Sequence, residues 1–180
     1  MINEQEMHQI IDKTLELEGG YVNNRYDLGG ETKFGISKRT YPQLDIKSLT
    51  KDWAKEIYER DFFKAQKLEQ LNDSGLAKQI FDMTVNIGKY AGGQIVQQAL
   101  NTCGHKVKID GIIGDETIRS LNRCKVGDVR GIIMTMLLSY YLNLYDKNKN
   151  DVSESRRLFY KDCLRSWSRR VLKTAEVSWI

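Results

Sequence analysis

Apolar side chains recur at three- and four-residue steps along most of the chain, the spacing that makes one face of an α-helix hydrophobic. Only one proline, Pro42, interrupts the sequence, and no repeat or low-complexity segment is present. The most regular stripe, from Val129 to Leu144, predicts a core helix. We predict seven helices, near residues 3–18, 50–62, 74–87, 91–101, 115–122, 127–146 and 153–173.

Residues 20–37 break the helical pattern. They are rich in Gly, Asn and Asp and end in KFGIS, a composition typical of short strands joined by turns. We expect a small N-terminal antiparallel hairpin or three-stranded sheet, so the predicted fold class is α+β and mostly α. The glycine pair at 92–93 and the turn-rich segment 103–117 predict joints between the later helices.

A carboxyl group stands at the very end of the first predicted helix. On a helical wheel of about 100° per residue, Glu18 lies near the middle of the apolar arc, one turn beyond Thr14. Burial and the negative end of the helix dipole both disfavour a charged carboxylate, so Glu18 would keep its proton and could act as a general acid. The alternative is an ordinary terminal residue that points to water or pairs with an arginine. The other residues of the arc are Met7, Ile10, Ile11, Leu15 and Leu17.

Asp27 and Thr32 follow this helix. The glycine pair between them, at 29–30, predicts a tight turn that folds the hairpin back over the helix end. Two carboxyl groups and a hydroxyl could then face one cleft, one carboxyl in an apolar setting and one in a polar loop. Glycoside hydrolysis requires this asymmetry of its acid and its base. The alternatives are a turn residue for Asp27 and an ordinary strand residue for Thr32.

Three further side chains are candidate substrate contacts. Asp82 and Asn86 lie four residues apart on the polar face of the predicted helix 74–87, where they could hydrogen-bond the hydroxyl and acetamido groups of a glycan. Tyr21 could stack on a sugar ring. The alternatives are a solvated helix face for the pair and a cover over the hairpin core for Tyr21.

The composition, 41% apolar and 29% charged, is that of an ordinary globular protein. The net charge of +4 suits an anionic partner, such as an acidic wall polymer or nucleic acid. A nucleic-acid binder would use the Arg-rich helix 153–173. The small net charge argues against it, and a solvated helix face is the simplest interpretation of that charge cluster.

Metal binding and membrane insertion are not expected. The chain has two histidines, and Cys103, Cys124 and Cys163 match no common zinc spacing. We therefore expect reduced, mostly buried thiols and no metal or cofactor, with a zinc site seeded by Cys103 and His105 as the alternative. The longest apolar stretch, 131–138, is too short to cross a bilayer.

The segment ELEGGYVNNRYDLGGETKFGIS resembles the N-terminal signature of the N-acetylmuramidases of glycoside hydrolase family 108. These are lysozyme-like proteins once labelled secretion activators, and some are phage endolysins. The resemblance implies that Glu18 is the catalytic acid, and the order Glu18, Asp27, Thr32 resembles the triad of phage lysozymes. Further segments resemble the family in the expected order: LTKDWAKEIYERDFF, IFDMTVNIG, KIDGIIGDETIRSLN and LRSWSRRV.

The resemblance implies a lysozyme-like catalytic lobe at residues 1–90 and a helical lobe of the type 3 peptidoglycan-binding kind at 91–180, packed as one globular unit. It implies hydrolysis of the β-1,4 bond between N-acetylmuramic acid and N-acetylglucosamine, with Asp27, aided by Thr32, activating water. The alternative is a non-catalytic peptidoglycan-binding or secretion accessory protein.

The expected partners are peptidoglycan glycan strands, with no nucleic acid and no integral membrane segment, and we expect a monomer. The first ten residues lack a signal-peptide pattern. We therefore expect synthesis in the cytoplasm and action at the cell wall or periplasm after release or dedicated secretion.

Overall fold

The computed structural model describes residues 1–17, 20–23 and 30–148. These residues form mostly helices and one small sheet, so the predicted α+β class is confirmed. Six of the seven predicted helices are found near their expected positions, and the prediction at 153–173 lies outside the described residues. The helices are α1 (Glu4–Leu17), α2 (Lys51–Tyr58), α3 (Ser74–Ile87), α4 (Lys89–Thr102), α5 (Asp115–Leu121) and α6 (Val126–Asn148), and the strands are β1 (Val22–Asn23), β2 (Glu31–Lys33) and β3 (Ile36–Ser37).

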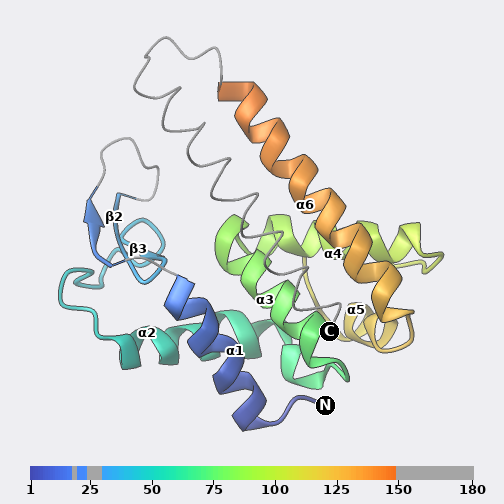
Figure 1. The fold of residues 1–180 in the computed structure, drawn as a ribbon, viewed down its shortest axis with the longest axis horizontal. Helices are drawn as coiled ribbons and strands as arrows, with labels where there is room; N and C mark the ends of the chain where they lie inside the picture. Colours follow the sequence, from blue (N-terminus) through green and yellow to red (C-terminus); the bar gives the residue numbers. More distant parts are fainter. Residues whose placement is uncertain (18–19, 24–29, 149–180) are drawn as a thin grey trace.

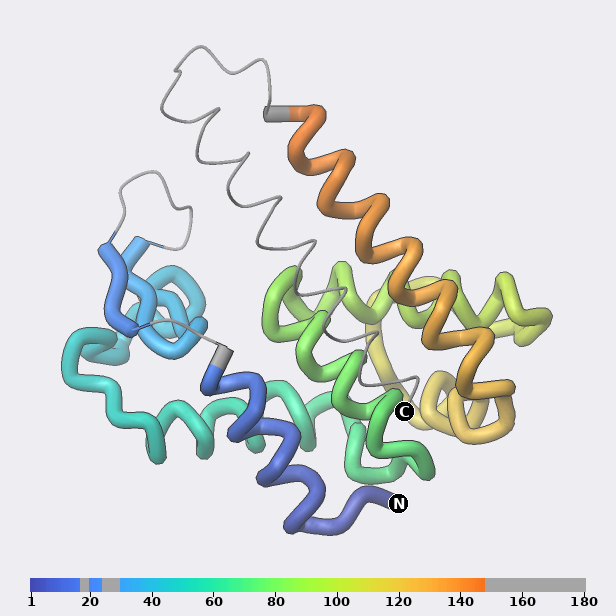
Figure 2. Tube along the Cα trace, in the orientation of Figure 1, coloured from blue at the N-terminus to red at the C-terminus, as the bar shows by residue number. Residues whose placement is uncertain are grey.

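Helix α3 lies at the centre of the fold and packs against α1, α4 and α6 (Figure 1). One hydrophobic core includes residues of every described α-helix, from Met7 in α1 to Tyr141 in α6. The sheet lies beyond the C-terminal end of α1, and the later helices gather on the other side of α3 (Figure 2). The lobe boundary between residues 90 and 91 stays a prediction.

Helix α1 begins at a reciprocal cap. The Glu6 N–H donates to the Asn3 side-chain oxygen at 2.9 Å, and the Asn3 N–H donates to the Glu6 carboxylate at 3.0 Å. The predicted apolar face is confirmed over the described part of the helix. Its nearly fully buried residues are Met7, Ile10, Ile11, Thr14 and Leu15. Burial of this face holds α1 against α2 and α3.

The sheet has the order β1–β2–β3, with both strand pairs antiparallel. Lys33 and Ile36 pair across a two-residue turn. The turn residues, Phe34 and Gly35, have φ values of 52° and 74°, as a type I′ turn requires. A non-glycine residue in this conformation costs roughly 1–2 kcal/mol. The Tyr58 hydroxyl offsets part of that cost, because it donates to the Phe34 carbonyl at 2.6 Å and so joins the turn to α2.

Helix α2 ends earlier than the predicted limit of residue 62. Its predicted N-cap is confirmed, since the Thr50 hydroxyl accepts from the Trp53 N–H at 3.2 Å. After Tyr58 the helix widens into a π-helix at Glu59–Phe63, which shifts the periodicity of the following side chains. Two short 3₁₀ turns then lead towards α3, at Lys64–Gln66 and Leu68–Gln70.

The glycine pair at 92–93 lies inside α4, so the predicted joint at this position is wrong. A Cβ on Gly92 would collide with the Thr84 side chain of α3, and one on Gly93 would collide with the Gly111 backbone. The two glycines therefore allow close approach of α4 to α3 and to the loop before α5. Buried Gln97 fixes that loop by accepting from the Gly111 N–H at 2.8 Å.

We predict that Tyr58→Phe lowers the free energy of unfolding by about 1 kcal/mol, because the Phe34 carbonyl loses its hydrogen bond. Urea denaturation followed by circular dichroism measures the change. Tyr90→Phe is the matched control, since Tyr90 is 65% exposed and should cost less than about 0.5 kcal/mol. Equal stabilities of the two variants would contradict the proposed anchoring of the turn.

Candidate active site

The candidate site lies where α1 ends beside the sheet (Figure 1). Glu18 and Asp27 lie outside the described residues, so their placement stays a prediction. The face of α1 that leads to this end is buried, since Thr14, four residues before Glu18, is 1% exposed. The last turn of α1 contains no basic residue to offset the negative end of the helix dipole. A carboxyl group on this face would meet conditions that favour its protonated form.

Thr32 lies on the central strand and pairs with Val22 on one side and Ser37 on the other. Its backbone therefore has the strand role that was the alternative interpretation. The half-buried side-chain hydroxyl donates to the Gly30 carbonyl at 3.3 Å, longer than a normal bond between oxygens. The hydroxyl can exchange this weak bond for a bond to a water molecule.

Tyr21, which directly precedes β1, and Glu31, the first residue of β2, form a pair. The Tyr21 hydroxyl donates to the Glu31 carboxylate at 2.5 Å, and this bond is the main cause that raises the pKa of Tyr21. Tyr21 is 39% exposed, which agrees better with a ring available to a ligand than with a cover over the core. Sequence reasoning missed Glu31, because its approach to Tyr21 depends on the strand register.

Asp82 and Asn86, the two candidate residues on α3, are less exposed to water than the sequence predicts. Asp82 is only 6% exposed, so the alternative of a solvated helix face is wrong for this residue. Asn86 is half-buried, and its side-chain amide donates to the Asp82 carbonyl at 2.7 Å. The physical reason is that α3 is surrounded by α1, α4 and α6, which leaves few of its positions in contact with water.

The same face of α3 carries a half-buried cation. Burial lowers the pKa of Lys78, and the nearby charges of Lys13 and Arg130 act in the same direction, whereas the Asp82 carboxylate opposes them. Opposite charges are thus concentrated on a partly dehydrated surface. Such a surface can orient a polar ligand more strongly than a fully solvated helix face.

A polar cluster that the sequence did not reveal ties the segment after the sheet to the helices. The Tyr41 hydroxyl donates to the Asp61 carboxylate at 2.8 Å, and the Lys89 ammonium donates to the Asp61 carbonyl at 2.9 Å. Arg60 pairs with the same carboxylate at 2.7 Å and, together with Tyr41, lowers the pKa of Asp61. Burial, followed by the bond to Asp61, raises the pKa of Tyr41. Because Asp61 belongs to the π-helix, regular helical periodicity could not place it.

Within residues 1–17, 20–23 and 30–148, no three His, Cys, Asp or Glu side chains come together as metal ligands could. Cys103 and Cys124 are free thiols that are partly buried against the hydrophobic core. Cys163 lies outside the described residues. The alternative zinc site at Cys103 and His105 thus lacks a ligand set in this part of the chain. No described helix has both the length and the apolar character to cross a bilayer.

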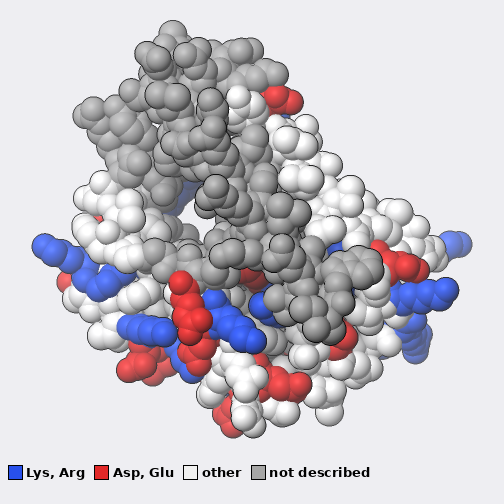
Figure 3. Space-filling view, in the orientation of Figure 1, with Lys and Arg blue, Asp and Glu red and all other residues white. Residues whose placement is uncertain are grey.

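The surface charge is mixed where Figure 3 shows it. Lys and Arg side chains are interspersed with Asp and Glu along the lower part of the face, and the described residues there form no large patch of one sign. The segment 153–173, on which the nucleic-acid alternative depends, lies outside the described residues.

We predict that Asp61→Asn makes stability less sensitive to acid. The pKa of Asp61 is lowered in the folded state. The ionised Asp61 carboxylate therefore contributes to the free energy of unfolding above its unfolded-state pKa of about 3.9. This contribution is lost as the pH falls through the pKa of Asp61 in the folded state. Between about pH 5 and pH 2.5, wild type should lose roughly 1–2 kcal/mol more unfolding free energy than the variant.

Urea denaturation at several pH values measures this difference. Asp52→Asn is the control, because the Asp52 carboxylate is exposed in the first turn of α2 and lies outside this cluster. An acid sensitivity of Asp61→Asn equal to that of wild type would show that the cluster does not stabilise the fold.

Comparison with known proteins relates this site to one family. Residues 11–88 match the family described as Glycosyl hydrolase 108. No curated protein matches the chain. The solved structure of Brucella abortus SagA is 20% identical, with a TM-score of 0.70, and the match covers 93% of this chain and 98% of that chain, so the two share a fold. This is consistent with the predicted lysozyme-like class. The matched segment, residues 11–88, includes Glu18, Asp27 and Thr32.

Proposed function

We propose that this protein is an N-acetylmuramidase that hydrolyses the β-1,4 bond between N-acetylmuramic acid and N-acetylglucosamine in peptidoglycan. The observation that carries the proposal is the match of residues 11–88 to a glycosyl hydrolase family, over the segment in which α1 leads its buried face towards Glu18. The substrate is the glycan strand, and the enzyme acts as a monomer without nucleic acid, metal or cofactor.

Glu18 acts as the general acid. The buried face of α1 and the uncompensated negative end of its dipole raise the cost of ionising a carboxyl group at this position. Glu18 gives its proton to the glycosidic oxygen as the bond to the sugar carbon breaks. The leaving sugar then departs as a neutral alcohol, and the positive charge that develops on the remaining ring is met by an attacking oxygen.

Asp27 acts as the base and Thr32 orients the attacking water. The water oxygen forms the new bond to the sugar carbon and passes its proton to Asp27, which balances the proton that Glu18 has donated. An inverting reaction requires a separation of about 6.5–9.5 Å between the two carboxyl groups. The weak hydrogen bond from Thr32 to Gly30 suits a hydroxyl that changes partner when water enters.

Glycan contacts extend from the sheet to α3. The half-exposed Tyr21 ring stacks on a sugar, and Glu31 holds the phenol in place. Asn86 contacts polar groups of the glycan from the end of α3. Asp82 is nearly buried, so it contacts the glycan less than Asn86 does and acts mainly through the electrostatic field of its carboxylate. The protein is made in the cytoplasm and reaches the cell wall or periplasm by release or dedicated secretion.

We predict that Glu18→Gln lowers the rate of clearing of purified peptidoglycan by at least about 100-fold, because the amide has no proton to donate. Asp27→Asn should lose about as much, because it cannot accept a proton from water. Glu16→Gln is the matched control: Glu16 is exposed, stands two residues earlier in α1 and should retain the wild-type rate. Equal clearing by wild type and Glu18→Gln would remove the proposed mechanism. Binding without clearing by wild type would favour the accessory-protein alternative.

We predict that Tyr21→Ala raises KM about three- to tenfold with little change in kcat, because a stacking surface is lost in both ground and transition states. Tyr21→Phe keeps the ring and loses only the bond to Glu31, so its KM should stay within about twofold of wild type. Steady-state hydrolysis of soluble glycan fragments separates the two parameters. An unchanged KM in Tyr21→Ala would exclude stacking.

A further inference from the structure

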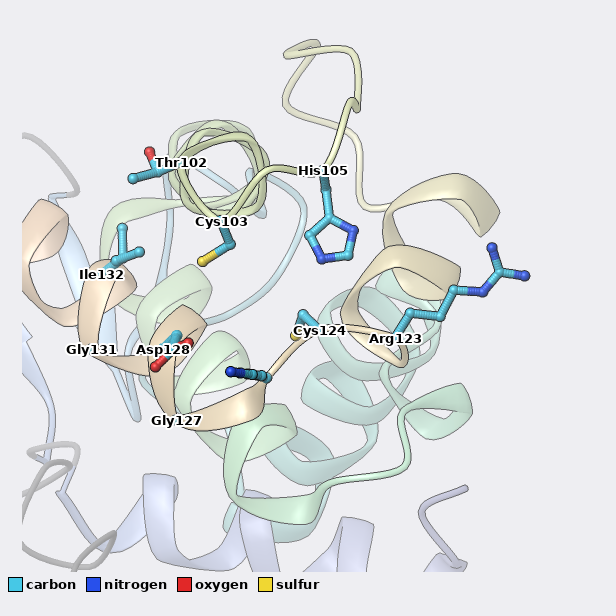
Figure 4. Close-up of a pocket in the computed structure, with 10 residues that line it drawn as sticks. Thr102, Cys103, His105, Arg123, Cys124, Gly127, Asp128, Gly131 and Ile132 are labelled. Atoms are coloured by element: carbon cyan, nitrogen blue, oxygen red, sulfur yellow. The ribbon is translucent and has the colours of Figure 1, made fainter.

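The loop that joins α4 to α5 presents apolar side chains to solvent. It leaves α4 past His105 and extends away from the pocket residues labelled in Figure 4 before it reaches α5. Ile109 is 45% exposed and Ile112 is 68% exposed. Tyr90 of α4 is 65% exposed and belongs to the same surface, because its ring lies against Gly111 of the loop. We call Tyr90, Ile109 and Ile112 the apolar patch.

Polar side chains of α4 hold this loop in a fixed conformation. Gln97, which is buried, accepts from the Gly111 N–H at 2.8 Å and donates to the Ile112 carbonyl at 3.0 Å. Asn101 accepts from the Val107 N–H at 2.8 Å and donates to the Val107 carbonyl at 2.9 Å. The Val107 side chain itself packs into the hydrophobic core. The exposure of the apolar patch is therefore imposed by a well-anchored backbone.

Two lysines extend from the same loop. Lys106 and Lys108 flank the inward-facing Val107 and are both exposed, the Lys108 side chain by 81%. The loop also contains one acidic residue, Asp110, whose carboxylate lies 3.9 Å from the Lys108 ammonium. That carboxylate accepts from the Gln97 amide at 2.8 Å and from a backbone N–H of the loop at 3.0 Å, so it is engaged within the protein. The charge that the loop offers to a partner is mainly positive.

Exposed apolar groups beside lysines have the chemistry of an anchor at a membrane interface. Isoleucine side chains gain from entering the boundary between headgroups and acyl chains, and tyrosine rings are favourable at the level of the headgroups. Lysine stems can lie along apolar surface while their ammonium groups reach the lipid phosphates. A hydrophilic polyanion would pair with the lysines and leave the isoleucines in water. The combination therefore favours an anionic lipid surface over an anionic polymer.

We propose that the apolar patch attaches this protein peripherally to a bilayer of anionic phospholipid, with the two lysines of the loop on the lipid phosphates. The protein then lies on the bilayer surface and does not span it. This attachment goes beyond the proposed hydrolysis of glycan strands, and it uses no residue of the candidate active site.

Co-sedimentation of the full-length protein with sucrose-loaded vesicles tests the proposal. Wild type should partition onto phosphatidylcholine vesicles that contain about 30% phosphatidylglycerol, and at least about fivefold less onto pure phosphatidylcholine. The double variant Ile109→Ser/Ile112→Ser should lower the partition coefficient at least about tenfold, because the inserted apolar area is lost. Lys106→Gln/Lys108→Gln should also lower it at least about tenfold, since each lysine near an anionic surface contributes about fivefold.

The matched control is Lys51→Gln/Trp53→Ser, which removes an exposed lysine and an exposed apolar side chain from α2. Its partition coefficient should stay within about twofold of wild type, because α2 carries no part of the apolar patch. Circular dichroism spectra verify that each variant is folded, and the lysine variant still tests the proposal if the isoleucine variant does not fold.

Failure of wild type to bind the anionic vesicles, or equal partitioning by wild type and the patch variants, would overturn the inference. Two other results obtained without vesicle binding would also overturn it. Patch-dependent self-association in analytical ultracentrifugation would assign the surface to a second copy of the chain, and patch-dependent binding to purified peptidoglycan would assign it to the wall. The proposed enzyme is scored separately, by clearing of peptidoglycan with Glu18→Gln, so either proposal can fail without the other.

Discussion

Burial of one face of α1 is the constraint on which the rest of the structure depends. That face is packed against α2 and α3 from Met7 to Leu15, so the direction in which the helix ends is fixed by the core. The last turn of α1 contains no Lys, Arg or His that would offset the negative end of the helix dipole. The same packing that stabilises the fold therefore creates an unfavourable position for a charged carboxylate, which is the environment that a general acid needs.

The sheet must be held firmly at that helix end, and two contacts outside the sheet do this. The Tyr58 hydroxyl holds the type I′ turn at Phe34, and the Tyr41–Asp61 bond with Lys89 joins the segment after the sheet to the π-helix and α4. A short sheet of two- and three-residue strands has little stability of its own. The position of Thr32 is therefore set largely by side chains on α2 and the π-helix.

Hydrophobic periodicity predicts the described helices, because each buries one regular stripe, and the small sheet is predicted by its turn-rich composition. Two predictions fail where tertiary packing matters. The glycine pair at 92–93 marks no joint, because close approach of α4 to Thr84 and Gly111 excludes larger residues there, and Asp61 leaves the helical register because it lies in the π-helix. The contact of Glu31 with Tyr21 and the burial of Asp82 depend on strand register and on neighbouring helices, neither of which the local sequence pattern specifies.

The central claim, that a helix end with a buried face keeps the Glu18 carboxyl protonated, has a direct measurement. Titration of ¹³C-labelled glutamate side chains by NMR, assigned by comparison with Glu18→Gln, gives the pKa of this group in the free protein. The account predicts a pKa well above the ordinary glutamate value of about 4.3, towards neutrality. A pKa at or below the ordinary value would contradict it.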